Sequence, residues 1–263
     1  MTRILHLTDL HFGFHRETLV QPLLDRIADL HPDLVVVTGD LTHRALEVQM
    51  AQARDFLDRI EVPLMLMPGN HDVPLWNPLA RMFWPFAGFR RYFGPSLTPI
   101  GRSGDVRVLS INSADPYVWQ RGKIRSGEIG RIIGGIDPLG TNIVALHHPL
   151  QQLPRVDKAL ARRASEALYR LEAAGVQVVL SGHLHRWALD DLLETGRHPR
   201  VLQIQTGTGL CARVTDRWNE FVLLEVDGPR LEVQRHRAPM EAERFQDPEI
   251  AVFSRATGVW ARV

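Results

Sequence analysis

Cysteine is almost absent from this 263-residue chain, in which Cys211 is the only one. A single cysteine cannot form an intramolecular disulfide, and it excludes a metal site built from several cysteines. An excess of charge of one sign is also lacking, because 31 basic residues stand against 30 acidic ones and the formal net charge is +1. The sequence therefore has no evident tract with which to follow a nucleic-acid backbone.

Long apolar runs are missing too, so we expect no transmembrane segment. The first residues, MTRILHLTDLH, begin a strand pattern at once and lack the architecture of a signal peptide. These absences favour a cytoplasmic protein. Repeats, low-complexity tracts and a clear linker are also lacking, and the length is ample for one large α/β domain, so residues 1–263 are expected to form a single domain.

Strand and helix patterns alternate along the first part of the chain. Strands are predicted at 3–8, 34–38 and 64–67, with helices at 17–30 and 46–60 between them. This order is typical of a mainly parallel sheet with right-handed crossovers. The rest of the chain predicts a turn-rich segment at 122–140, a helix at 155–173, and strands at 106–112, 142–147, 176–181, 201–206, 221–226 and 231–236, the last two joined by a DGP turn.

Residues 73–104 interrupt this alternation. They contain seven aromatic residues and four arginines but neither Asp nor Glu. We expect an insertion of short helices, and three interpretations stay open: a substrate lid, a surface for a homodimer, or a packed cap. In the lid interpretation Arg90 and Arg91 assist substrate binding. The tail at 238–263 carries no pattern that assigns a role.

Histidine, by contrast, is frequent, with 12 residues, and metal-binding side chains follow five of the predicted strands. The carboxyl ends of parallel strands share one edge of a sheet, where ligands bind, so groups distant in sequence can converge there. The DxH and HxH spacings place two side chains on the same side of an extended segment. The candidate donors are Asp9 and His11 in DLH, Asp40 in GD, Asn70 in PGNHD, His147 in HHP, and His183 and His185 in GHLH.

The donor set also indicates which metals it would hold. Carboxylate, imidazole and amide oxygen donors suit Mn²⁺, Fe²⁺ or Fe³⁺, or Zn²⁺, and the lack of thiolates argues against a structural zinc site. Seven donors are too many for one tetrahedral ion and suit two. Two ions roughly 3.5–4 Å apart can hold a hydroxide between them and clamp an in-line displacement at phosphorus. Gly39, Gly69 and Gly182 each precede a donor and let the backbone leave its strand sharply, with no Cβ in the way.

These motifs, in this order, resemble those of the calcineurin-like metallophosphoesterase superfamily, and most closely its class III branch of cyclic-nucleotide and glycerophosphodiester phosphodiesterases. The resemblance spans Asp9 to His185 and implies a four-layer α/β/β/α sandwich with mixed sheets and the helices outside. It implies that one metal is bound by Asp9, His11 and His185. It assigns the second metal to Asn70, His147 and His183, with Asp40 bridging both. His71 would bind neither metal, but would stabilise the phosphate and help to protonate the leaving oxygen.

Five further residues are weaker candidates for roles around the metals. Asp72 would orient its neighbours, and His148 would support the site or form its wall. His43 and Arg44 follow GDLT and could touch substrate, although the start of a helix explains them equally well. Asn112 follows the strand at 106–112 and could line the pocket.

These observations predict a two-metal phosphodiester hydrolase that acts on a small anionic diester, such as a cyclic nucleotide or a glycerophosphodiester. A metal-bridging hydroxide would attack phosphorus in line. The alternatives are a phosphomonoesterase or a hydrolase of lipid-linked (pyro)phosphodiesters from the same superfamily. A DNA nuclease would need a longer capping region and a basic DNA path, and a non-catalytic scaffold would be expected to have lost ligands.

Overall fold

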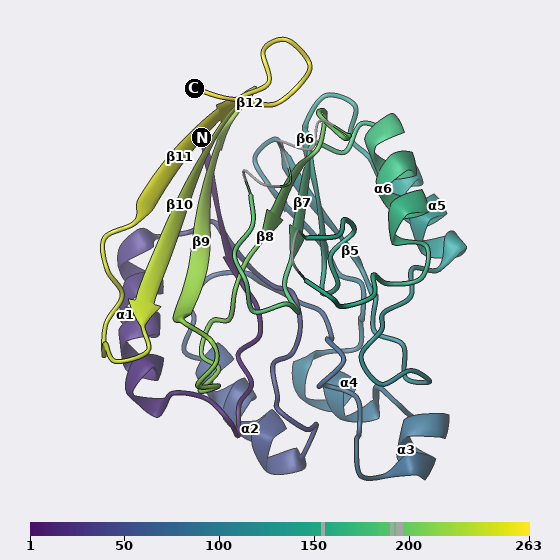
Figure 1. The fold of residues 1–263 in the computed structure, drawn as a ribbon, viewed down its shortest axis with the longest axis vertical. Helices are drawn as coiled ribbons and strands as arrows, with labels where there is room; N and C mark the ends of the chain where they lie inside the picture. The colour runs from purple at the N-terminus through teal and green to yellow at the C-terminus, as the bar shows by residue number, and fades with distance from the viewer. Residues whose placement is uncertain (154–155, 190–191, 193–196) are drawn as a thin grey trace.

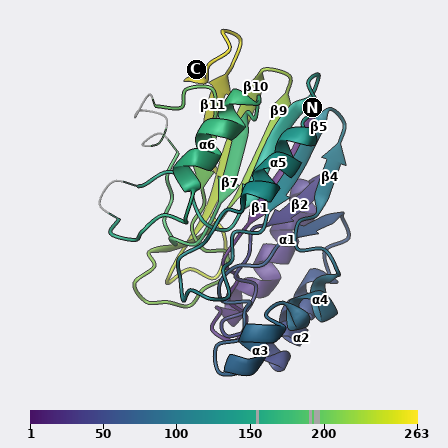
Figure 2. The same ribbon diagram turned by 90° about the vertical axis from the view of Figure 1, so that its right-hand side faces the viewer.

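Two β-sheets face each other between two outer layers of helices in the computed structural model, which describes residues 1–153, 156–189, 192 and 197–263 (Figure 1). The prediction of a four-layer α/β/β/α sandwich is confirmed. Both termini lie at one end of the molecule, and Figure 2 shows the short helices α3 and α4 at the opposite end.

The larger sheet has seven strands in the order β12-β11-β10-β9-β1-β2-β3. The first three strands pair in parallel, as the alternating pattern of the sequence predicts, and the C-terminal strands continue the sheet in antiparallel fashion from β1. The strands are β1 (Thr2–Leu7), β2 (Leu34–Val37), β3 (Leu64–Leu66), β9 (Trp218–Asp227), β10 (Arg230–Pro239), β11 (Glu249–Ser254) and β12 (Ala261–Arg262).

The smaller sheet has five strands in the order β4-β5-β6-β7-β8, parallel except for the first. Its strands are β4 (Ile100–Ser103), β5 (Val106–Ile111), β6 (Thr141–Leu146), β7 (Val178–Ser181) and β8 (Leu202–Gln205). The helices are η1 (Glu17–Leu19), α1 (Val20–Leu30), α2 (Glu47–Leu57), α3 (Pro78–Phe83), α4 (Ala87–Phe93), α5 (Ser126–Gly134) and α6 (Ala164–Ala173).

Three apolar cores separate the four layers, because neighbouring residues of each buried strand point to opposite faces. In β1, Ile4 joins the core between the sheets, whereas Leu5 joins the core beneath α1 and α2. In β6, Ile143 faces the other sheet and Val144 packs toward α5 and α6. Strands covered on both faces explain why the sequence shows continuous apolar runs such as LVVV.

Three predictions of local structure are wrong or incomplete. The segment 122–140 contains α5, because Ile129 and Ile132 are buried against the small sheet and this packing outweighs the low helix propensity of its glycines. The helix predicted at 155–173 begins at Ala164; residue 155 lies outside the described residues, and Arg162 instead exchanges backbone hydrogen bonds with residues 122 and 124. The insertion at 73–104 holds two short helices as expected, but it ends in a strand, β4.

The C-terminal tail, which has no predicted role, adds β11 and β12 to the edge of the large sheet. In the part of the chain that the structure describes, no helix combines the length and the apolar character that crossing a bilayer requires.

Candidate metal centre

The seven candidate donors meet at the carboxyl ends of five strands that belong to both sheets. Three of the segments follow β1, β2 and β3 of the large sheet, and two follow β6 and β7 of the small one. The expectation that a single sheet edge gathers them is therefore wrong, because the two sheets face each other and share this end. Two hydrogen bonds join the sheets here: the ring of His147 contacts the Thr38 carbonyl oxygen at 2.9 Å, and the His183 amide donates to Asp9 Oδ2 at 2.9 Å.

Left-handed backbone conformations gather at these strand ends. The φ angles are 54° at Asp9, 51° at His11, 51° at Asp40, 74° at His183 and 52° at His185. The DxH and HxH segments are therefore not extended, and it is the tight turn, rather than alternation along a strand, that aims both side chains of each motif at one point. Such conformations cost residues with a Cβ on the order of 1–2 kcal/mol each, and they cluster at functional sites.

The glycines before the donors work in two different ways. Gly39 has a φ of +95°, which a side chain would strain. Gly182 is required because there is no room for a side chain: a Cβ there would lie 1.9 Å from Thr8 Oγ1 and 2.5 Å from Asp9 Oδ2. At Gly69 a Cβ would lie 2.1 Å from Asp40 Oδ1. These glycines let the ligand loops approach one another closely.

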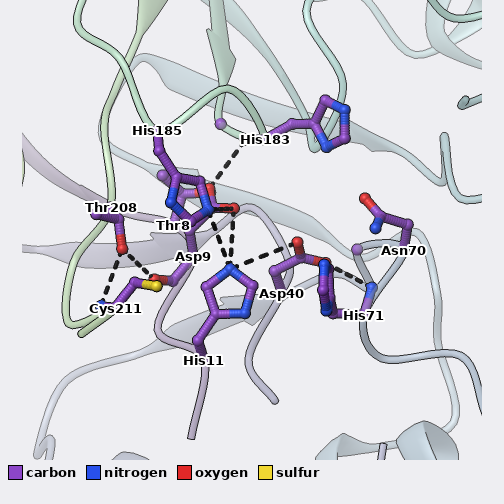
Figure 3. A network of polar contacts seen from close by, with 12 residues as sticks. Thr8, Asp9, His11, Asp40, Asn70, His71, His183, His185, Thr208 and Cys211 are labelled. Carbon is purple, nitrogen blue, oxygen red and sulfur yellow. Dashed lines mark hydrogen bonds and ion pairs between the residues drawn. The ribbon is translucent and has the colours of Figure 1, made fainter. Parts of the chain in front are cut away.

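Asp9, His11 and His185 form one half of the cluster (Figure 3). Asp9 Oδ1 lies 3.2 Å from His185 Nε2 and 3.6 Å from His11 Nε2, and the two imidazole nitrogens lie 3.1 Å apart. The three donor atoms therefore face one another. Asp9 and His11 follow β1 of the large sheet and His185 follows β7 of the small one, so the facing of the two sheets brings the three residues together.

Asn70, His147 and His183 form the other half. Asn70 Oδ1 lies 3.1 Å from His147 Nε2, and the rings of His147 and His183 have centroids 5.1 Å apart. Asp40 lies between the halves, with Oδ2 3.3 Å from His147 Nε2 and 3.8 Å from His11 Nε2. The Asp40 carboxylate is therefore close enough to both halves of the cluster to supply a ligand to each.

The cluster fits divalent metal ions by geometry and by chemistry. Metal–ligand bonds of about 2.0–2.2 Å place neighbouring ligand atoms about 3.0–3.5 Å apart. Four of the contacts above lie in this range, and the two from His11 Nε2 to the aspartates are slightly longer, at 3.6 and 3.8 Å. The side chains of Asp9, His11 and His147 are fully buried, and among the described residues Asp9 Oδ1 has no hydrogen-bond donor. A buried carboxylate oxygen without a donor is costly unless a cation satisfies it.

The electrostatics of the cluster favour positive charge within it. Burial alone would raise the pKa of the Asp9 carboxyl, but His185, His11 and His147 hold that pKa well below its usual range. Burial alone would lower the pKa of the His147 imidazole, but the carboxylate of Asp40 raises that pKa to about 9. Burial would also raise the pKa of Asp40, but His147 and His71 hold it well below its usual range. The two aspartates are therefore ionised, and they offer buried negative charge that a metal ion can neutralise.

His71 and Asp72, which complete the PGNHD motif, occupy different places. His71 Nδ1 lies 2.6 Å from the His43 carbonyl oxygen, so Nδ1 carries the hydrogen and Nε2 is left for another partner. Asp72 is buried and accepts hydrogen bonds from the amides of Gly69, Leu41 and Thr42 at 2.9, 3.2 and 2.9 Å. It thus ties the GD loop to the GNHD loop, and burial together with the Asp40 charge raises its pKa to about 6.

The weaker candidates separate into three groups. His148 is a buried wall residue: its ring contacts Ser113 Oγ at 2.9 Å and packs on His183 with centroids 4.4 Å apart. His43 and Arg44 line a cavity beside His71. The Asn112 side chain accepts a hydrogen bond from the Ala114 amide at 3.1 Å, so it stabilises a turn rather than joining the cluster.

Four residues around the cluster were missed by sequence reasoning. Asp216 Oδ2 lies 2.6 Å from His185 Nδ1, and Thr8 Oγ1 donates to Asp9 Oδ2 at 2.6 Å. Thr208 donates to the Asp9 carbonyl oxygen, and the sulfur of Cys211 lies within 4.8 Å of ring nitrogens of His11 and His185. Asp216, Thr208 and Cys211 follow β8, so the rule that strand ends supply the site could have pointed to their loop.

Two large cavities adjoin the cluster, besides a small one of about 10 Å³ that is lined by residues including His148 and His183. One, of about 800 Å³, opens beside His185 and is lined by residues that include Leu184, Trp187, Arg213 and Asp216. The other, of about 180 Å³, opens beside Asn70 and His71 and is lined by residues that include Arg44, Arg81 and Trp119. Arg90 and Arg91, which the lid interpretation singled out, line neither cavity, whereas Arg81 of the same insertion lines the smaller one.

Comparison with known proteins agrees with the geometry. The family model described as calcineurin-like phosphoesterase matches residues 2–187. A "Probable cyclic nucleotide phosphodiesterase" of Vesicomyosocius okutanii subsp. Calyptogena okutanii is 24% identical over 181 residues, which are 67% of this chain and 72% of the relative. A "Probable glycerophosphodiester phosphodiesterase GpdQ" of Arcobacter nitrofigilis is 25% identical over 219 residues, 82% of this chain and 71% of the relative.

Among solved structures, a purple acid phosphatase from yellow lupin seeds superposes with a TM-score of 0.69 at 16% identity. The match covers 95% of this chain but 53% of the lupin chain, so this protein spans about half the length of that neighbour. At this identity the likeness is one of fold.

Proposed function

The chain belongs to the calcineurin-like phosphoesterase family and is a phosphoric ester hydrolase, and we propose that it cleaves phosphodiesters with two divalent metal ions. Asp9, His11 and His185 would hold one ion. Asn70, His147 and His183 would hold the other, and Asp40 would contact both. We further propose that residues 1–263 work as one domain, since β9 to β12 extend the sheet that begins with β1.

The observation that carries the diester proposal is the pair of cavities on either side of the donor cluster. The larger cavity is reached past His185, and the smaller one past Asn70 and His71. A phosphodiester has two ester arms on one phosphorus atom, and each arm then has a space of its own. A monoester would fill one of these spaces and leave the other to water.

When bound, the two ions would polarise the phosphoryl oxygens and lower the pKa of a coordinated water. The chain's own residues supply the rest. His71 keeps Nδ1–H on the His43 carbonyl, and with a second proton on Nε2 it would donate that proton to the leaving oxygen and return to the neutral ring. Asp72 fixes the two loops that carry Asp40 and Asn70, so that these ligands are held before substrate arrives.

For the metals we propose Mn²⁺, iron or Zn²⁺, because the donors are imidazoles, carboxylates and one amide oxygen. The substrate would be a small anionic diester, in keeping with relatives named for cyclic nucleotides and for glycerophosphodiesters.

The test compares bis(p-nitrophenyl) phosphate with p-nitrophenyl phosphate in the presence of Mn²⁺ and of a chelator. We expect the diester to be cleaved faster, and the activity to be lost with chelator and in Asp40→Ala. Faster cleavage of the monoester would contradict this proposal and would indicate a phosphomonoesterase instead. Protein that holds metal but turns over neither ester would favour the non-catalytic scaffold.

An exposed apolar surface favours one second candidate, a lipid-linked diester as substrate. Trp76, Phe83, Trp84 and Trp119 are each more than half exposed, and Arg81 joins α3 to the loop that carries Trp119 through a hydrogen bond to the Pro116 carbonyl at 2.6 Å. This surface adjoins the smaller cavity, which Trp119 and Arg81 line. Exposed tryptophans beside arginines suit the headgroup region of a bilayer.

Cosedimentation with phosphatidylcholine vesicles containing phosphatidylglycerol tests this candidate. Binding that is lost in the double variant Phe83→Ser and Trp84→Ser would support it. Protein that stays in the supernatant would remove it, and a concentration-dependent dimer that the same variant abolishes would assign the surface to a second copy of the chain.

A further inference from the structure

The larger cavity is lined by more positive charge than its acidic residues can neutralise. Five of its lining residues are cationic, namely Lys158, Arg186, Arg213, Arg217 and Arg235, and three are acidic, namely Asp157, Asp216 and Glu220. Two of the acids are already engaged, since Asp216 contacts the His185 ring and Glu220 forms an ion pair with Arg235. Positive charge therefore dominates the remaining wall.

Four of the five cations lack a carboxylate partner within the described residues. Arg235 has two, Glu220 and Glu249, and its guanidinium lies over the Trp187 ring at 4.6 Å from the centroid. No described carboxylate lies within ion-pair distance of Lys158, Arg186, Arg213 or Arg217. Like charges that converge on a concave wall repel one another and raise the local concentration of anions.

Two of these cations lie close to the metal centre. Lys158 lines the cavity together with His185, and it also lines a small neighbouring pocket with His148 and His183. The carbonyl oxygen of Arg213 accepts a hydrogen bond from the amide of Asp216 at 2.9 Å, and the Asp216 side chain contacts the His185 ring. Lys158 and Arg213 thus belong to the part of the wall that meets the donor cluster.

We propose that this cavity binds a second anionic group of the substrate, so that the preferred phosphodiester carries a further phosphate on one arm. The inference rests on the diesterase function proposed above. Lys158 and Arg213 are the residues that would contact the added phosphate, because neither has a carboxylate partner among the described residues and both lie on the wall that adjoins His185.

The proposal narrows the substrate class. A diester with a quaternary ammonium arm would be repelled by this wall. A cyclic mononucleotide has one phosphate, which the metal centre would take, and it would leave the cations without a ligand. One face of Trp187 and one of Trp218 are covered by Arg235 and Arg237, so the wall offers charge rather than open stacking surface. A diester that carries an extra phosphate on one arm places one phosphate at the metal centre and the other against the cationic wall.

Binding to the Mn²⁺-loaded protein tests the inference independently of turnover. The probes are thymidine 3′,5′-bisphosphate and thymidine 5′-monophosphate, with affinity measured by calorimetry. We expect the bisphosphate to bind at least about tenfold more tightly, as one charge-assisted phosphate contact allows. Raising the salt from low to high concentration should reduce this preference, because the cavity is open to solvent.

The preference should shrink to less than about threefold in the double variant Lys158→Gln and Arg213→Gln. Arg244→Gln is the matched control, since Arg244 is exposed and does not line the cavity. Equal affinity for the two probes would overturn the inference. So would a preference that the double variant leaves intact, because the extra phosphate would then bind elsewhere.

A second measurement separates this inference from the function on which it rests. The p-nitrophenyl ester of thymidine 5′-phosphate is compared with the same ester carrying a 3′-phosphate. A lower KM for the phosphorylated ester that the double variant removes supports both proposals. If neither ester is cleaved but the binding preference stands, the diesterase function fails alone; if both are cleaved alike and the probes bind alike, the cavity inference fails alone.

Discussion

Nδ1 of His185 lies 2.6 Å from Oδ2 of Asp216, while Nε2 of the same ring lies 3.2 Å from Oδ1 of Asp9. The imidazole is therefore held through Nδ1, while Nε2 faces the carboxylate of Asp9. Because Asp216 accepts a hydrogen bond from Nδ1, the lone pair of Nε2 can face the donor cluster. The loop after β8 thus positions a ligand that the loop after β7 supplies.

Removing this carboxylate should weaken metal binding. In Asp216→Ala the His185 ring loses the contact that fixes its orientation, and we expect the affinity for Mn²⁺ to fall by about 10- to 100-fold. Titration with Mn²⁺, followed by electron paramagnetic resonance of the free ion, measures the affinity. Asp157→Ala is the control, since this acid lines the same cavity and should change the affinity by less than threefold. An unchanged affinity in Asp216→Ala would show that His185 needs no such support.

A methyl group at Gly182 should disrupt the centre, although it is the smallest possible addition. The Cβ of Gly182→Ala would lie 1.9 Å from Thr8 Oγ1 and 2.5 Å from Asp9 Oδ2, so the GHLH loop must move away. We expect loss of metal binding and a destabilisation of about 1–3 kcal/mol in urea unfolding. Gly130→Ala, in α5 with open space around it, should instead stabilise the protein by about 0.5–1 kcal/mol. Equal effects of the two changes would contradict the close approach of the loops.

Chelation should lower the thermal stability of the protein. The buried carboxylates of Asp9 and Asp40, and the left-handed residues around them, are stabilised by any cation that binds only the folded state. At a free metal concentration of about 100 times Kd the gain is about 2.7 kcal/mol. We expect the Tm measured by calorimetry to fall by about 5–10 °C on adding EDTA to Mn²⁺-loaded protein. Asp40→Ala should lose most of this response; a full response in that variant would place the metal elsewhere.

His236 should make folding stability depend on pH. Its ring stacks on Phe221 with centroids 4.6 Å apart, and among the described residues neither ring nitrogen has a hydrogen-bond partner. Burial lowers the pKa to about 4, whereas the ordinary value is 6.5. The unfolded chain therefore binds the proton more readily, and stability is lost as the pH falls from 6.5 toward 4.

At pH 5 this loss amounts to about 2 kcal/mol from this one group. His236→Phe keeps a ring against Phe221 and should remove that part of the pH dependence. Urea unfolding at pH 7.5 and pH 5.0 measures the difference, with His31→Asn, at an exposed position, as the control. If the variant loses as much stability between the two pH values as the native protein does, His236 is protonated in the folded state as well.

Much of the fold and of the cluster could be predicted from the sequence because one pattern repeats. Asp9, Asp40, Asn70, His147 and His183 each follow an apolar run directly or within a few residues, and parallel strands place such positions at one end of the fold. That rule needs no knowledge of which sheet a strand joins. It therefore located the donors even though the expectation of one shared sheet edge was wrong.

The remaining features depend on packing that no local pattern encodes. α5 contains three glycines and forms because Ile129 and Ile132 are buried against the small sheet. The left-handed turns at His11 and His185 are imposed by loops that converge from two sheets, and propensity alone predicts neither. Asp216 was missed because its significance lies in a contact with a residue 31 positions away, across β8.

The C-terminal part of the chain carries none of the seven donors, yet β9 pairs with β1 from Thr2↔Val226 to His6↔Val222. The match to the family model ends at residue 187, before this strand. A chain truncated there would retain every donor, but β1 would become an edge strand, paired with β2 on one side and open to other chains on the side that β9 occupies. The loop that carries Asp9 and His11 would then follow a strand that is stabilised on one side only. Proteolytic removal of this segment should inactivate the enzyme through aggregation, without cutting a single ligand from the polypeptide.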